Sequence, residues 1–128
     1  MTFHPTIDAE VLELRPDFMA LSIHVTGARN GPSDTSSEAL LTKAVQSLDA
    51  HPWAEAHLGA WREAYRAFGA KPKKTPCSAE ALRKRAVKDG AMRPLNAVVD
   101  LYNAVSLNRP GFTGGCFVCH SGGVIDQF

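Results

Sequence analysis

The sequence predicts a single helix-rich domain that also contains a strand, which is an α+β fold. Its 128 residues suffice for one hydrophobic core. Four segments repeat apolar residues at helical spacing, and one segment alternates apolar with polar residues. Hydrophobic residues at 45% and charged residues at 21% are typical of globular proteins, and no apolar run reaches the roughly 20 residues that span a bilayer. We therefore expect no membrane association.

The strand is predicted over residues 18 to 26, FMALSIHVT. Alternate apolar residues from Met19 to Val25 fall on one face, which is the pattern of a half-buried strand. Residues 27 to 37 are rich in Gly, Asn, Pro and Ser and predict a loop. Ser36 or Ser37 is then the expected N-cap of the first helix.

The four predicted helices cover residues 37 to 48, 52 to 69, 78 to 90 and 94 to 107. Gly69 and Gly90 suit the left-handed ends of the second and third helices, and Ser78 suits the N-cap of the third. The second helix has one stripe that is expected to be core: Trp53, Leu58, Trp61, Tyr65 and Phe68. The fourth has one apolar face: Leu95, Val98, Val99, Tyr102 and Val105.

Positive charge is concentrated in the middle of the chain. Between Arg62 and Arg93 there are ten basic and three acidic residues, although the formal net charge of the whole chain is only +1. Such a segment suits contact with phosphates, because Lys and Arg replace the counterions of a polyanion. The alternative is a solvated helix face. The RNA-binding candidates are Arg62, Arg66, Lys73, Lys74, Arg83, Lys84, Arg85 and Lys88.

Three stretches follow one another along the chain: WREAYRAFG, then KK with SAEALRKRAVKDG, and then PLNAVVDLYNAVSL. Their order resembles the B3/B4 domain, which occurs in the β subunit of bacterial phenylalanyl-tRNA synthetase and in free-standing proteins. The resemblance covers about residues 55 to 107. It implies an α+β domain that binds tRNA and is related to the hydrolytic editing of misacylated tRNA. The candidate pocket residues are Asn96, Asp100, Asn103 and Ser106, and the alternative is that they only hold the scaffold together.

The resemblance ends near residue 115. Residues 1 to 113 are expected to form a partial B3/B4-like domain, and residues 114 to 128 a Gly- and Cys-rich tail outside the family pattern. The strand-rich second half of the family is then missing, so the chain is expected to be truncated or altered. An exposed strand edge would favour self-association.

The tail contains Cys116, Cys119 and His120 in the C-x-x-C-H pattern of c-type haem attachment. The N-terminal residues lack a basic region and a continuous apolar stretch, so we expect no signal peptide and a cytoplasmic location. Haem attachment is therefore disfavoured. A zinc site with Cys77 or His24 as fourth ligand is the other metal interpretation. Free thiols are favoured, so the expected cofactor is none.

The leading functional hypothesis is a tRNA-binding or RNA-binding protein of B3/B4 type. Whether it is an enzyme stays open: an aminoacyl-tRNA deacylase, which hydrolyses an ester, and a related domain without activity both fit. Catalytic residues are not identified. The alternatives are a small metal-binding protein that uses the C-terminal Cys and His residues, and a non-catalytic helical interaction domain.

Overall fold

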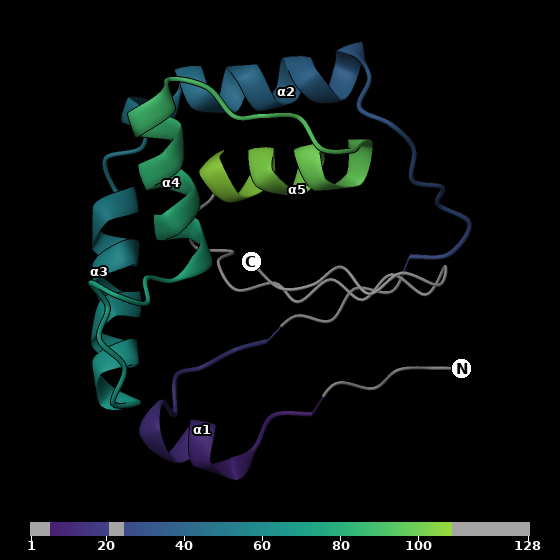
Figure 1. Ribbon diagram of the computed structural model, residues 1–128. Helices are drawn as coiled ribbons and strands as arrows, with labels where there is room; N and C mark the ends of the chain where they lie inside the picture. The colour runs from purple at the N-terminus through teal and green to yellow at the C-terminus, as the bar shows by residue number, and fades with distance from the viewer. Residues whose placement is uncertain (1–5, 21–24, 109–128) are drawn as a thin grey trace.

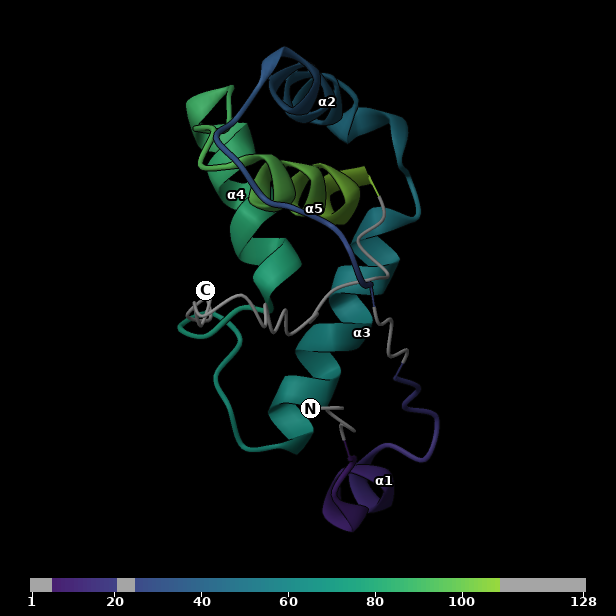
Figure 2. The ribbon, with the colours of Figure 1, turned by 90° about the vertical axis from the view of Figure 1, so that its right-hand side faces the viewer.

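Helices account for the regular structure of the residues described by the computed structural model, 6–20 and 25–108, of which 60% are helical (Figure 1). The α-helices are α1 (Ala9–Leu14), α2 (Thr35–Gln46), α3 (Ala54–Ala67), α4 (Ser78–Asp89) and α5 (Ala97–Asn108), and a 3-10 turn, η1, covers Leu48–Ala50. Helix α1 has no buried residue and lies near the C-terminal end of α3 (Figures 1 and 2).

Helices α2 and α5 run parallel and side by side (Figures 1 and 2). Hydrogen bonds join them near both ends. Near their N-termini, Ser37 of α2 donates to Asp100 of α5, and near their C-termini the Ser47 hydroxyl donates to Asn108 at 3.1 Å. Because α2 and α5 are parallel, the chain must return from the end of α2 to the start of α5. Helices α3 and α4 lie across these two helices, and residues 90–96 after α4 run back along them (Figure 1).

The main core lies where α2, α4 and α5 meet. Its buried members are Leu41, Ala44, Leu48, Ala86, Ala104 and Leu107. Three of the six are alanines, and these small side chains let the helices approach closely. A second cluster joins α3 to the start of α4: Leu58, Cys77 and Ala79, with Trp61 and Tyr65 packed against it.

The prediction of an α+β fold is wrong for the described residues, which are helical and contain no strand. Residues 18–20 and 25–26 have no secondary structure, and residues 21–24 of the predicted strand lie outside the described part. Met19 is 90% exposed and Val25 is 67% exposed. Alternation alone does not make a strand, because the backbone N–H and C=O groups also need a neighbouring strand with which to pair.

The helix starts differ from the predicted ones. Asp34, and neither Ser36 nor Ser37, caps α2: its carboxylate accepts the N–H of Ser37 at 2.8 Å, and the Ser37 hydroxyl accepts the N–H of Asp34. This reciprocal pair is a capping box. Helix α4 has Cys77 at its N-cap, without a side-chain hydrogen bond, so the predicted Ser78 cap is also wrong.

The predicted left-handed helix ends at Gly69 and Gly90 are both confirmed. Gly90 has φ +66°, and Gly69, which follows Phe68 at the end of α3, has φ +80°. The N–H groups of Gly69 and Ala70 donate to the carbonyls of Arg66 and Tyr65, both at 2.9 Å. This is the Schellman arrangement, which satisfies two carbonyls that the helix leaves unpaired.

We predict that Gly69→Ala lowers the free energy of unfolding by about 1 kcal/mol, because a Cβ is strained at positive φ. A Cβ would meet no atom within 4 Å at either Gly69 or Gly59, so crowding does not contribute. Gly59 lies inside α3, where alanine favours the helix, and Gly59→Ala should stabilise the protein by about 0.5–1 kcal/mol. Urea unfolding of both variants checks this. Equal effects of the two substitutions would contradict it.

Candidate nucleic-acid interface

Helix α5 buries its polar side. Asp100 is fully buried, and Asn103 and Ser106 are also buried, whereas Leu101 is half exposed and Val105 nearly so. Of the apolar face predicted for this helix, only Val99 is buried. The predicted face is therefore wrong, although the helix itself is confirmed. The four pocket candidates lie on one helix, with Asn96 immediately before its first residue.

The Asp100 carboxylate is the centre of a buried hydrogen-bond network. One oxygen, Oδ2, accepts the hydroxyls of Ser33 at 2.6 Å and Ser37 at 3.0 Å, and Oδ1 accepts the backbone N–H of Leu95 at 2.8 Å. Burial by itself would raise the pKa of Asp100. The hydroxyl and backbone donors outweigh burial, and the pKa lies below its ordinary value.

The loop before α2 also satisfies the N-terminus of α5. The N–H of Ala97 donates to the carbonyl of Gly31 at 3.0 Å, and that of Val98 donates to the side-chain oxygen of Asn30 at 3.1 Å. The N–H of Val99 donates to the side-chain oxygen of Asn96 at 3.0 Å, which makes Asn96 an N-cap. Asn96 and Asp100 therefore have definite scaffold contacts.

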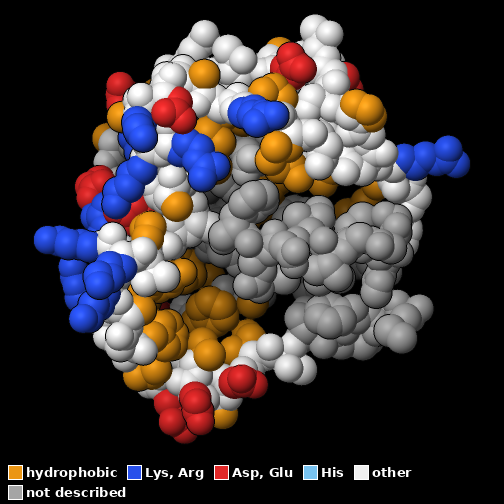
Figure 3. Space-filling view, viewed as in Figure 1, with side chains coloured by type: hydrophobic (Ala, Val, Ile, Leu, Met, Phe, Trp, Pro, Cys, Tyr) orange, Lys and Arg blue, Asp and Glu red, His pale blue; other side chains and the backbone are white. Residues whose placement is uncertain are grey.

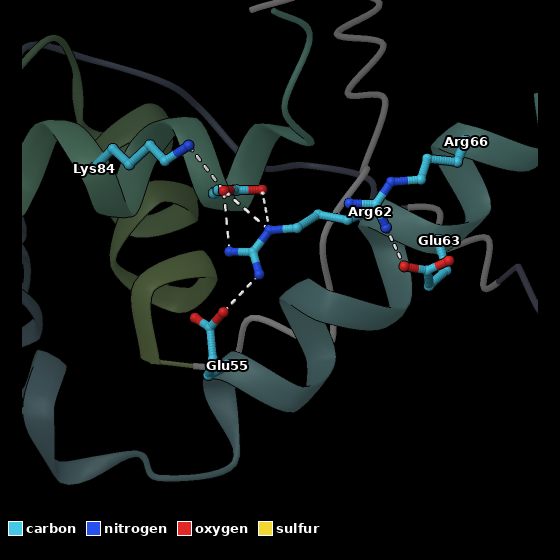
Figure 4. A network of polar contacts seen from close by, with 6 residues as sticks. Glu55, Arg62, Glu63, Arg66 and Lys84 are labelled. Atoms are coloured by element: carbon cyan, nitrogen blue, oxygen red, sulfur yellow. Dashed lines mark hydrogen bonds and ion pairs between the residues drawn. The ribbon is translucent and has the colours of Figure 1, made fainter. Parts of the chain in front are cut away.

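The basic candidates divide into two groups, of which the first makes internal contacts. Arg62 of α3 reaches across to α4, where its Nε and Nη2 donate to the Glu80 carboxylate at 3.0–3.2 Å (Figure 4). Its Nη1 binds Glu55, and Lys84 binds Glu80 at 2.8 Å from the other side. Glu80 is only 4% exposed, so this carboxylate needs its cationic partners.

The pKa shifts follow from these contacts. Burial alone would raise the pKa of Glu80, but hydrogen bonds from Arg62 and Lys84 hold it below its ordinary value. The pKa of Arg62 is raised, first by the hydrogen bond to Glu55 and then by that to Glu80. Glu80 and Arg62 are therefore both charged at neutral pH.

Two further basic candidates belong to the same internal group. Arg83 donates from Nη2 to the carbonyl of Leu48 at 2.9 Å, and its Nη1 is buried without a hydrogen-bond partner. Arg66 of α3 pairs with Glu63 of the same helix, and both side chains are exposed (Figure 4). The Arg83 side chain is thus directed to the η1 turn rather than to the surface.

The second group is exposed. Lys73 and Lys74 lie in the loop between α3 and α4, and Arg85 and Lys88 lie on α4; all four are exposed and form no ion pair with another described residue. Lys71, which is not among the RNA-binding candidates named above, is exposed in the same loop. Figure 3 shows Lys and Arg side chains gathered along the side of the molecule formed by α3, α4 and their loop. We call Lys71, Lys73, Lys74, Arg85 and Lys88 the basic surface.

Residues 60–110 match the family model of the B3/4 domain. This segment is of the B3/4 type. The match confirms the resemblance seen in the sequence and relates the segment to a family associated with the β subunit of a tRNA synthetase. No curated protein and no solved structure gives a significant match. The B3/4-type segment contains the whole basic surface as well as Asp100.

The metal hypotheses concern residues that are mostly outside the described part. Cys116, Cys119, His120 and His24 all lie there, as does the predicted domain boundary at residues 113 and 114. Within residues 6–20 and 25–108, no three His, Cys, Asp or Glu side chains are grouped to hold a metal. Cys77 is buried there as a free thiol. None of the described helices is both long and apolar enough to cross a membrane.

We predict that Asp100→Asn destabilises the protein by about 1–3 kcal/mol at pH 7, because a charged acceptor of three hydrogen bonds becomes a neutral amide. The folded pKa of Asp100 is lowered, so its contribution to stability is present above the unfolded value of about 3.9 and is lost as the pH falls through the folded value. Urea unfolding from pH 7 to pH 2 should therefore show the two proteins converging in acid. A constant difference across this range would contradict the prediction.

The ion-pair network predicts unequal effects of its two cations. Arg62→Ala should cost about 1–3 kcal/mol, because it leaves the buried Glu80 carboxylate without its bidentate partner. Lys84→Ala should cost less than about 1 kcal/mol, because the Lys84 side chain is 61% exposed. Thermal and urea unfolding compare the two variants. A larger loss for Lys84→Ala would show that Arg62 does not hold α3 against α4.

Proposed function

We propose that this protein binds RNA, with tRNA as the preferred form, through the basic surface. The observation that supports this proposal most directly is which charged residues of α3, α4 and their loop form ion pairs and which do not. Glu55, Glu63 and Glu80 each bind an Arg or Lys, whereas the five residues of the basic surface form no ion pair with a described residue. Five exposed, uncompensated positive charges on one side of the molecule suit a polyanion.

The family relation favours RNA among polyanions, since the B3/4 family is associated with a tRNA synthetase subunit. Phosphate contacts of this kind give affinity without reading sequence, so the basic surface supports binding to the backbone rather than to particular bases. The protein would then associate through long-range attraction, and its affinity would fall steeply with salt.

Hydrolysis of a misacylated tRNA has less support than binding. An editing pocket must hold a water and supply donors for the developing oxyanion. The carboxylate of Asp100 already accepts three hydrogen bonds, and the Asn96 side chain caps α5. Asn103 and Ser106 are at most 8% exposed. A pocket role for these four residues stays a prediction, and binding is the function that the geometry supports best.

We predict that Lys73→Ala/Lys74→Ala and Arg85→Ala/Lys88→Ala each weaken tRNA binding. The slope of log K against log salt should become shallower by about 0.7–0.9 for every phosphate contact removed. Fluorescence anisotropy with labelled tRNA at several salt concentrations measures both quantities. Each double variant lowers the net charge by two.

Arg29→Glu is the charge-matched control, because it lowers the net charge by the same amount. Arg29 is exposed in the segment before α2. In Figure 1 this segment runs on the opposite side of the molecule from α3 and α4. The control should bind tRNA much more tightly than the double variants. If all three variants bind alike, net charge alone determines affinity, and the basic surface is not the site.

A further inference from the structure

Phe68 is the one member of the predicted aromatic stripe of α3 that is largely exposed. It is 46% exposed, whereas Leu58 is buried and Trp61 and Tyr65 pack against the second core cluster. The helical spacing of the stripe predicts a core position for Phe68, and that prediction is wrong. Because its ring is exposed, Phe68 contributes little hydrophobic burial to the stability of the folded protein.

The backbone around Phe68 is fixed. The N–H of Phe68 donates to the carbonyl of Ala64 at 3.1 Å, and the next two N–H groups close the Schellman arrangement described above. Phe68 therefore presents its ring from a defined position at the end of α3. A ring on a fixed backbone loses less conformational entropy on binding than one on a mobile loop.

Three lysines of the basic surface follow Phe68 directly. Lys71 is three residues away, so its Cα lies within about 11 Å of that of Phe68. The N–H groups of Lys74 and Thr75 both donate to the carbonyl of Lys71 at 2.9 Å, and this turn keeps Lys73 and Lys74 at the same end of α3. Hydrophobic side chains lie beside the basic ones in this region in Figure 3.

We propose that Phe68 stacks on an unpaired base of the bound RNA while Lys71, Lys73 and Lys74 contact the flanking phosphates. This inference rests on the proposed RNA-binding function and specifies its ligand as a single-stranded or looped segment. Stacking on an aromatic ring and phosphate contacts from Lys are the two components of single-strand recognition. A base inside a duplex is already stacked on its neighbours and would not reach the ring.

An anionic membrane is the competing partner for lysines beside a phenyl ring. Membrane-surface binding depends on a long apolar helix face that enters the lipid. Near the end of α3, Trp61 and Tyr65 pack against the second core cluster, so Phe68 is the one ring of the stripe that is exposed there. The charge and the single ring therefore favour a nucleotide.

The test measures the affinity of the full chain for three probes: a single-stranded RNA, the same strand with abasic sugars, and a duplex of equal length. Phe68→Ala should weaken binding of the single strand about 5- to 100-fold and leave the salt slope unchanged. It should leave binding of the abasic strand and the duplex unchanged. Phe68→Trp should retain the affinity and report stacking by quenching of its fluorescence.

Two control variants make the result specific. Leu40→Ala removes a side chain that is also 46% exposed, but on α2, and should not change binding. Phe68→Leu keeps an apolar side chain without an aromatic ring and should bind like Phe68→Ala. Circular dichroism confirms that each variant is folded.

Three results would overturn the inference. These are full affinity of Phe68→Ala for the single strand, an equal loss with the abasic strand, and tighter binding to phosphatidylserine vesicles than to RNA. Loss of binding in the lysine variants together with full affinity of Phe68→Ala would leave the proposed function intact and remove only the stacking role. Absence of binding to every RNA by the unmodified protein would remove both.

Discussion

The buried carboxylate of Asp100 determines how the two parallel helices α2 and α5 are arranged. It binds the hydroxyls of Ser33 and Ser37 at the start of α2, and it lies in the first turn of α5. The N-termini of α2 and α5 therefore both lie beside the negative charge of the Asp100 carboxylate. Each terminus carries a partial positive charge, so parallel helices would repel one another there without such a group. The chain must then return to the start of α5, and residues 90–96 make that return after α3 and α4 (Figure 1).

Local periodicity predicted helices close to α2 to α5, and two of their ends, because these features depend on neighbouring residues. Gly69 and Gly90 end helices because their own backbone adopts a positive φ, which glycine favours. The buried face of α5 could not be predicted in this way. Its orientation depends on Ser33 and Ser37, more than 60 residues away in the chain, and hydropathy assigns Asp100 to the solvent. The prediction of the strand was wrong for a related reason, because the alternation of apolar and polar residues does not reveal whether a partner strand exists.

The candidate interface was predictable as a region but not residue by residue. Counting charges gives Arg62, Arg83 and Lys73 the same weight. In the structure the two arginines reach across to other elements, to Glu80 and to the Leu48 carbonyl, whereas Lys73 is exposed. This division follows the chemistry of the side chains, because the guanidinium fork suits bidentate contacts within a protein and the ammonium group is more strongly hydrated. Internal partners decide which positive charges stay available to a ligand.

The internal arginines also connect the scaffold to the surface. Arg62 holds α3 to α4 at Glu80, and the second core cluster joins the same two helices nearby. The basic surface is divided between the α3–α4 loop and α4, and Phe68 ends α3. The Arg62–Glu80 ion pair and the second core cluster therefore hold the loop lysines, the phenyl ring and the α4 charges near one another. Since a polynucleotide presents phosphates at regular spacing, such a preset arrangement lowers the entropic cost of binding it.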